Sequence, residues 1–248
     1  MRGQVIKIAQ VSDSHLLDDA EKNIHGINPY RRLQKIFQWL FKKSYDLILF
    51  TGDITNNASE KSFQQLSEIL KPHTQRVLAI SGNHDNSNFL ARMASDFLIV
   101  EPGYPLVIGE WRFIYVNTVV LGKNYGFITD DTIDRLRQQL EECKHNKICI
   151  VMHHHPFEIG IGVVDKYKIK NTEKLTSTFT DNVKLVVYGH VHGDYTIFQE
   201  NIIYTSAPST GFQFTKEGVD INRYGLKEYI ISNENIQFGS IWFGDSCS

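Results

Sequence analysis

Residues 45–53 read YDLILFTGD, an apolar run that ends abruptly in threonine, glycine and aspartate. An apolar run of this length, bounded by turn residues, predicts a buried strand. Four further runs have the same form and end in Asp, Asn or His: 5–15 (VIKIAQVSDSH), 76–85 (RVLAISGNHD), 147–155 (KICIVMHHH) and 183–192 (VKLVVYGHVH). One local pattern, a strand followed directly by a polar cluster, therefore recurs along the chain.

Helical patterns separate these strands. Apolar residues recur at helical spacing over residues 29–43, which begin with a proline, and further helices are predicted over residues 59–70 and 129–142. The last of these opens with Thr129 as its N-cap and has acidic residues in its first turn. Strands that alternate with helices imply right-handed crossovers and a mostly parallel core sheet.

Two regions break this alternation. Residues 104–120 and the C-terminal stretches 194–207 and 226–243 have the pattern of antiparallel hairpins, with turns at Gly109-Glu110 and Glu200-Asn201. We therefore expect an α/β fold, a four-layer α/β/β/α sandwich of two mixed β-sheets flanked by helices. No internal repeat, low-complexity segment or linker interrupts the sequence, so residues 1–248 are expected to form a single domain.

The composition is that of an ordinary globular protein, with 42% hydrophobic and 22% charged residues and a net charge of -2. This charge balance argues against a nuclease that binds duplex nucleic acid and leaves small anionic substrates open. The three cysteines, Cys143, Cys149 and Cys247, have no CxxC spacing and are expected to be reduced or buried thiols. With neither a signal-peptide pattern nor a membrane-length apolar run, we expect a cytoplasmic protein without a membrane partner.

The polar clusters all follow strands, and ligands of open α/β sheets bind at the carboxyl ends of strands. Each cluster alone has an ordinary explanation: Asp13 could be a turn former, and Asn83-His84-Asp85 could be three turn residues. In the extended segment Gly189-His190-Val191-His192, however, alternation points both imidazoles to one side. The restriction of the clusters to Asp, Asn and His favours a metal site at these strand ends.

The chemistry of this donor set narrows the kind of metal site. No cysteine belongs to it, which argues against a structural zinc site built on thiolates. Imidazole with carboxylate and amide oxygen suits iron, manganese or zinc. The polar clusters at the strand ends supply seven candidate ligands. Seven are too many for one tetrahedral metal and suit two metal ions that share a carboxylate.

The series Asp13-x-His15, Gly52-Asp53, Gly82-Asn83-His84-Asp85, His153 and Gly189-His190-x-His192 resembles the calcineurin-like metallophosphoesterases over residues 6–192. Within that family the chain is most similar to the bacterial class III cyclic-nucleotide phosphodiesterases. This narrower resemblance rests on QVSDSHL (10–16), VMHHHP (151–156) and SAPSTGFQF (206–214).

The resemblance implies the site residues. One metal would be held by Asp13, His15, Asp53 and His192, and the other by Asp53, Asn83, His153 and His190, with Asp53 as the bridge. The family pattern selects His153 and leaves His154 and His155 to supporting or packing roles. The substrate phosphate would lie over the metal pair, near His15, Asp53, Asn83, His84 and His192.

His84 is expected to be catalytic, because Asn83 already supplies the ligand from this cluster and an imidazole can protonate a departing alkoxide. The expected reaction is hydrolysis of 3',5'-cyclic AMP to 5'-AMP by a metal-activated hydroxide. Aromatic candidates for contact with the base are Phe157, Tyr188, Phe212 and Phe214, although packing is the more ordinary role of each, and His25 could also approach the substrate.

Several alternatives stay open at this stage. The same ligands would serve a nucleotidase, a pyrophosphatase, a 2',3'-cyclic phosphodiesterase or a protein phosphatase. A scaffold that has lost catalysis should lack ligands, and here every position is filled. The metal identities are not fixed, and the late hairpins leave a homodimer open. Some relatives have a longer C-terminal tail, so any role of such a tail is in doubt for this chain.

Overall fold

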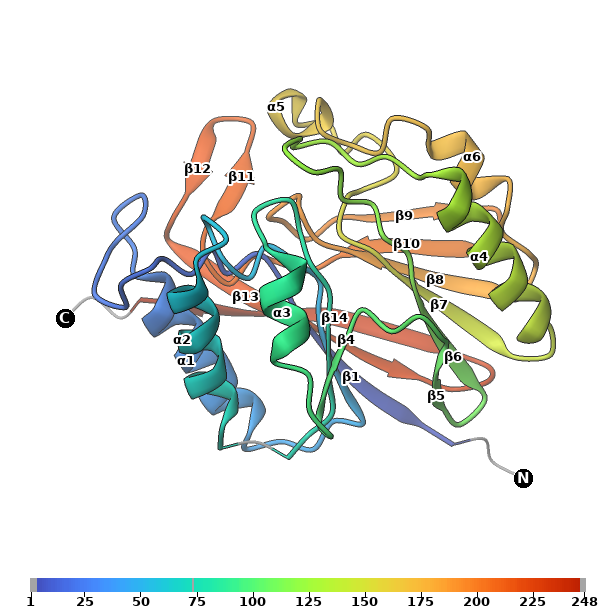
Figure 1. Cartoon of the computed structure of the whole chain (residues 1–248), viewed down its shortest axis with the longest axis horizontal. Coiled ribbons are helices and arrows are strands. Elements are labelled where there is room, and N and C mark those ends of the chain that lie inside the picture. Colours follow the sequence, from blue (N-terminus) through green and yellow to red (C-terminus); the bar gives the residue numbers. More distant parts are fainter. Residues whose placement is uncertain (1–3, 73, 246–248) are drawn as a thin grey trace.

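The computed structural model describes residues 4–72 and 74–245 and contains two six-stranded sheets packed face to face (Figure 1). The first sheet has the order β14-β13-β1-β2-β3-β4. Its strands are β1 (Ile6–Val11), β2 (Leu47–Phe50), β3 (Val77–Ala79), β4 (Leu98–Val100), β13 (Arg223–Ile231) and β14 (Ile236–Gly244). Strands β1 to β4 run parallel, while β13 pairs antiparallel with both β1 and β14.

The second sheet has the order β5-β6-β7-β8-β10-β9. Its strands are β5 (Leu106–Ile108), β6 (Trp111–Tyr115), β7 (Lys147–Val151), β8 (Val183–Tyr188), β9 (Thr196–Gln199) and β10 (Ile202–Ser206). The four central strands are parallel and each edge strand is antiparallel. A short two-stranded hairpin, β11 (Gln213–Thr215) with β12 (Gly218–Asp220), projects beyond the sheets.

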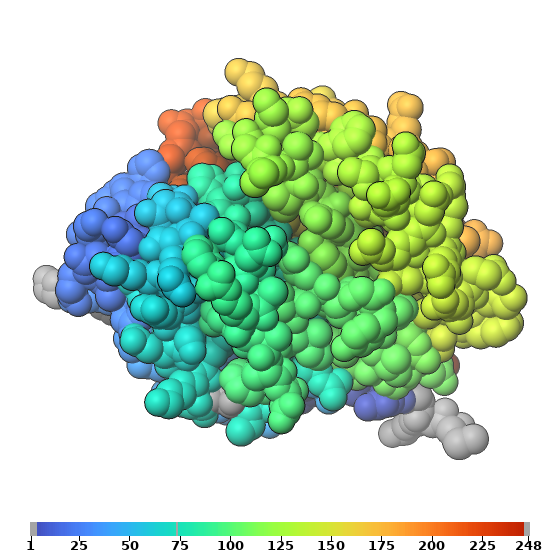
Figure 2. Space-filling view, in the orientation of Figure 1, coloured from blue at the N-terminus to red at the C-terminus, as the bar shows by residue number. Residues whose placement is uncertain are grey.

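Helices cover the outer faces of the two sheets. The helices are α1 (Pro29–Leu40), α2 (Glu60–Leu70), α3 (Ser87–Arg92), α4 (Asp130–Glu142), α5 (Gly162–Asp165) and α6 (Thr172–Thr176). The side chain of Asn28 accepts the N–H of Arg31 to cap α1, and Thr129 caps α4 as predicted, accepting the N–H of Thr132 at 3.2 Å. In the space-filling view, residues from the N-terminal third (blue to green) and from the middle of the chain (yellow-green) share one face (Figure 2).

Successive side chains of a strand point to opposite faces of its sheet, and this produces three apolar layers. In β2, Ile48 and Phe50 face the helices of the first sheet, whereas Leu47 and Leu49 face the core between the sheets. Trp111 of β6 fills the same inter-sheet core from the other side. A third cluster joins the second sheet to α4 and α6. The four-layer α/β/β/α arrangement predicted from the sequence is therefore confirmed.

Some features of the fold go beyond the sequence prediction. The predicted C-terminal hairpin forms, as β13 and β14, and it extends the first sheet by pairing with β1. Cys143 and Cys149 are buried free thiols, and Cys247 lies outside the described residues. None of the described helices is both long and apolar enough to cross a bilayer.

Candidate metal centre

The polar clusters meet at one place because their strands end at the same edge of the sandwich (Figure 1). β1, β2 and β3 of the first sheet lead to the clusters at residues 13–15, 53 and 83–85, and β7 and β8 of the second sheet lead to those at 153–155 and 190–192. Six of the seven predicted ligands are buried: Asp13, His15, Asp53, His153, His190 and His192.

The backbone bends sharply at the predicted ligands. Five of the seven have positive φ: Asp13 (52°), His15 (50°), Asp53 (48°), His190 (68°) and His192 (46°). Residues with a Cβ rarely adopt this conformation, which costs of order 1–3 kcal/mol each and is typical of functional sites. The neighbouring strand end supports it, since the N–H of Asp13 donates to Gly52 O and the N–H of His15 donates to Asp53 O, both at 3.0 Å.

Four of the predicted ligands form one compact group. Donor atoms of Asp13, His15, Asp53 and His192 all lie within 4.8 Å of one another. The Nε2 atoms of His15 and His192 are 2.9 Å apart, His15 Nε2 is 3.8 Å from Asp53 Oδ2, and His192 Nε2 is 3.8 Å from Asp13 Oδ1. This is the set that the family resemblance implies for one metal ion.

A second group lies on the other side of Asp53. His153 Nε2 is 3.4 Å from Asp53 Oδ1 and 3.2 Å from Asn83 Oδ1. The ring of His190 is 5.2 Å from that of His153. Asp53 thus presents Oδ2 to one group and Oδ1 to the other, which is the geometry that a bridging carboxylate requires.

Backbone carbonyls orient two of the imidazoles. His192 Nδ1 lies 2.9 Å from Phe212 O, and His153 Nδ1 lies 2.8 Å from Thr51 O. Because a carbonyl oxygen only accepts, Nδ1 carries the proton, and in a neutral ring Nε2 then presents a lone pair to the cluster. Hydrogen bonds of this kind are typical of metal-ligating histidines.

The electrostatics of the cluster favour a positive charge beside its carboxylates. Burial raises the pKa of Asp13 to about 7 and lowers the pKa of His15 to about 4. For His153, burial lowers the pKa, but the carboxylates of Asp53 and Asp13 outweigh it and raise the pKa to about 9. Lone pairs of imidazole, carboxylate and amide therefore converge in a water-poor space that favours added positive charge. Divalent metal ions fit this donor set.

Two glycines let the clusters approach each other. A Cβ on Gly82 would lie 2.1 Å from Asp53 Oδ1, and a Cβ on Gly52 would lie 2.5 Å from His153 Nδ1. Both distances are shorter than any real contact, so only glycine allows the ends of β2, β3 and β7 to meet at this spacing.

His84 lies beside the cluster and is held by the backbone. Its own N–H donates to Asp53 Oδ1 at 2.9 Å, and its Nδ1 donates to Asn56 O at 2.8 Å. Its ring is 5.0 Å from that of His15 and lines the open cleft. The ring is therefore oriented with Nδ1 engaged and Nε2 available to a ligand.

The other two consecutive histidines have different surroundings. His154 belongs to a group with His153 and His190 whose nitrogens lie within 4.8 Å, but both of its own nitrogens are engaged, Nδ1 by Thr118 Oγ1 and Nε2 by Asn124 O. His155 is buried, with its ring stacked 5.5 Å from that of His190. His154 therefore has no free lone pair to offer to the cluster, whereas both ring nitrogens of His155 are buried without a hydrogen-bond partner among the described residues.

The cluster opens into a cleft of about 260 Å³. Of the aromatic residues singled out in the sequence, Phe212 and Phe214 line it, as does His25. Phe157 instead packs 5.0 Å from Tyr204, and Tyr188 is buried in the core. Six further lining residues were not singled out in the sequence, because no local pattern marks them: Ile24, Asn56, Asn124, Val163, Val164 and Tyr167.

Comparison with known proteins agrees with this geometry. A sequence model of the calcineurin-like phosphoesterase family matches residues 6–194, which include all seven predicted ligands. The chain belongs to this family. Among curated proteins, this calcineurin-like phosphoesterase is 36% identical to a "Probable cyclic nucleotide phosphodiesterase" of Coxiella burnetii, over 98% of this chain and 99% of that one.

Two more relatives show how far the likeness extends. A 3',5'-cyclic adenosine monophosphate phosphodiesterase of Haemophilus influenzae is 28% identical over 85% of this chain and 78% of its own. A dimetal phosphatase from Danio rerio superposes with a TM-score of 0.72 at 10% identity, over 97% of this chain and 99% of that one. The second likeness concerns the fold alone. Together with the cluster, the family membership supports a metal-dependent phosphoesterase.

Proposed function

We propose that this phosphoesterase hydrolyses 3',5'-cyclic AMP to 5'-AMP. The observation that carries the proposal is the cleft, in which a buried ligand cluster meets an apolar rim and no described lining residue is Lys or Arg. A cyclic phosphodiester carries one negative charge, which a metal pair can neutralise, whereas pyrophosphates carry further charges that basic side chains usually bind. The names of the relatives support the same substrate class.

We propose that Asp13, His15, Asp53 and His192 hold one metal ion and that Asp53, Asn83, His153 and His190 hold the other. Iron, manganese and zinc all suit this donor set. When bound, such a pair supplies Lewis-acid charge to the phosphate oxygens and makes water nucleophilic near neutral pH. The oxygens of Asp53 face both groups, which supports its role as the shared ligand.

His84 would act on the leaving group. As the water oxygen bonds to phosphorus, the bond from phosphorus to the ribose 3' oxygen breaks and that oxygen takes up a proton. The Nδ1 bond to Asn56 O holds the ring, so that Nε2 can deliver this proton to the 3' oxygen. His15, Asp53, Asn83 and His192 line the same cleft and would surround the phosphate together with His84.

The test is turnover of metal-reconstituted protein against 3',5'-cyclic AMP, 2',3'-cyclic AMP, bis(p-nitrophenyl) phosphate and a phosphomonoester, with Asn83→Ala as the control. Preference for 3',5'-cyclic AMP that is lost in the variant supports the proposal. Activity on the generic diester alone would retain the two-metal hydrolase and reject this substrate. Absence of activity with every metal would favour a non-catalytic scaffold.

A further inference from the structure

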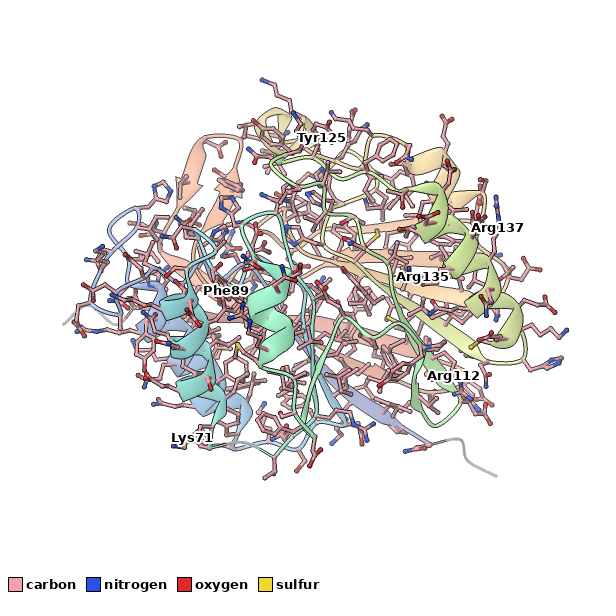
Figure 3. All side chains as sticks on the ribbon, viewed as in Figure 1. Lys71, Phe89, Arg112, Tyr125, Arg135 and Arg137 are labelled. Carbon is pink, nitrogen blue, oxygen red and sulfur yellow. The ribbon has the colours of Figure 1, made fainter. Side chains whose placement is uncertain are left out.

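One side of the cleft is built from the segment around α5, outside the metal-binding motifs. Val163 and Val164 of α5 and Tyr167 just after it line the cleft together with Phe212 and Phe214. In Figure 1, α5 (gold) and the β11–β12 hairpin (orange) rise on either side above the strand ends. Tyr125, next to the lining residue Asn124, is labelled near α5 in Figure 3.

Two side chains on this side of the cleft are more exposed to solvent than is usual for apolar residues. Val163 is 59% exposed and Tyr167 is 37% exposed, although both are large and apolar in body. Single exposed apolar residues are common on protein surfaces, but here two of them line the same cleft as the ligand cluster. A concave apolar surface next to a few polar groups is the usual form of a small-molecule site.

Both walls are fixed to the metal-binding region. The carboxylate of Asp165 accepts the N–H groups of Ile159 at 2.8 Å and Gly160 at 3.1 Å, and the N–H of Ile169 donates to His155 O at 3.0 Å. On the opposite side, the N–H of Phe214 donates to His192 O at 3.1 Å, and the two rings lie 4.5 Å apart. Each wall is therefore hydrogen-bonded to a polar cluster at a strand end, at His155 on one side and at His192 on the other.

The charge of the cleft restricts what can lie between these walls. Apart from Asp53, the described lining residues are apolar, aromatic, amide or imidazole. The exposed side-chain amide of Asn124 has no hydrogen-bond partner among the described residues, so it can both donate to and accept from a ligand. Flat apolar faces with hydrogen-bonding edges are the chemistry of a nucleobase, which stacks on aromatic side chains.

We infer that Val163, Tyr167 and Phe214 form a nucleobase subsite, with the Asn124 amide at the edge of the base. This inference rests on the proposed function, because it assigns the recognition of the nucleotide to residues outside the metal centre. Tyr167 supplies the stacking face from the α5 side, and Phe214 limits the cleft on the side of His192. The base thus sets the orientation of the phosphate over the ligands.

The test compares the dissociation constants of 5'-AMP and ribose 5-phosphate for the manganese-loaded protein by isothermal titration calorimetry. The two ligands share ribose and phosphate, so their ratio isolates the base. We expect 5'-AMP to bind about 10-fold more tightly. Tyr167→Ala and Val163→Ser should bring the ratio toward one, whereas Tyr104→Ala, at a 63% exposed tyrosine outside the cleft, should leave it unchanged.

A ratio near one in the unmodified protein would overturn the subsite, as would a ratio that survives both cleft substitutions in proteins with unchanged thermal unfolding. Because the readout is binding, it separates the two proposals. Base-dependent binding without turnover of cyclic AMP would retain the subsite and reject the proposed function. Turnover of cyclic AMP with equal dissociation constants for 5'-AMP and ribose 5-phosphate would retain the proposed function and reject the subsite.

Discussion

His192 and Phe212 are joined by a 2.9 Å hydrogen bond from Nδ1 to the carbonyl oxygen, so a proposed metal ligand and a wall of the cleft share one support. Ser209, in the same loop as Phe212, connects this loop to the polar cluster at residues 13–15. Its hydroxyl donates to Asp13 O at 2.7 Å and accepts the N–H groups of Gly211 and Phe212. The segment at 206–214 therefore contacts two proposed ligands, Asp13 and His192, which lie far apart in the sequence.

Ser209→Ala should weaken metal binding without unfolding the protein. The substitution removes the hydrogen bond to Asp13 O and leaves two buried N–H groups without their acceptor. Loss of such supporting contacts typically lowers metal affinity about 10- to 100-fold. Metal titration followed by calorimetry measures this, and Ser240→Ala is the matched control because the hydroxyl of Ser240 is buried without a partner. Equal affinities in the two variants would contradict the argument.

Asp53→Asn should empty both metal positions. The amide keeps the shape of the side chain but removes the charge that faces both His15 and His153. Without Lewis-acid assistance worth several kcal/mol, the rate on bis(p-nitrophenyl) phosphate should fall by about 10³-fold or more. Elemental analysis after reconstitution gives the metal content directly. Retention of both ions in this variant would show that Asp53 is not the shared ligand.

His84→Ala should retain its metals and lose turnover. General acid catalysis contributes about 10²- to 10⁴-fold, so kcat on cyclic AMP should fall by that factor. The fall should be much smaller with bis(p-nitrophenyl) phosphate, because its leaving group departs readily without a proton. Elemental analysis and parallel kinetics on both substrates check this. A variant without metal, or an equal loss on both substrates, would rule out the role of proton donor.

The sequence sufficed for the fold and for the place where the proposed ligands gather, because both signals are local. Each strand is an apolar run, and each ligand follows its run within a few residues, as Asp53 follows β2 and His190 follows β8. The parallel arrangement then brings the strand ends together. The pairing of β13 with β1 was not predictable in this way, because it joins strands more than 200 residues apart in sequence.

The rest of the cleft depends on contacts that no local pattern encodes. Among three consecutive histidines, the sequence offers no physical reason to prefer His153, and the distinction arises because Thr118 and Asn124 engage His154 from a separate loop. Tyr167 reaches the cleft only because the segment around α5 folds back against His155. Such residues become visible only once the tertiary structure is known.

Lys227 provides a test of stability that does not depend on turnover. Its side chain on β13 is 1% exposed, and its ammonium donates to Thr205 Oγ1 at 2.6 Å and Asp194 Oδ1 at 2.5 Å. Burial lowers the pKa of Lys227, and the carboxylate of Asp194 opposes this. Asp194→Asn should destabilise the protein by about 3 kcal/mol near neutral pH, because it leaves a buried ammonium without a counter-charge. Lys227→Met should destabilise the protein less than Asp194→Asn does, since the remaining carboxylate of Asp194 is 35% exposed and reaches water.

The loss in Asp194→Asn should shrink as the pH rises. Removal of the Asp194 carboxylate lowers the pKa of Lys227 in the folded state further. Below this pKa, Lys227 is protonated in both the folded and the unfolded state, so the variant shows its full loss of stability. Above it, the unfolded chain binds more protons than the folded one, and the free energy of unfolding increases with pH. Urea unfolding of the variant and the unmodified protein at neutral pH and at about pH 9.5 measures the difference. If the difference in unfolding free energy between the two proteins stays constant or widens with pH, the ammonium of Lys227 is not the destabilising group.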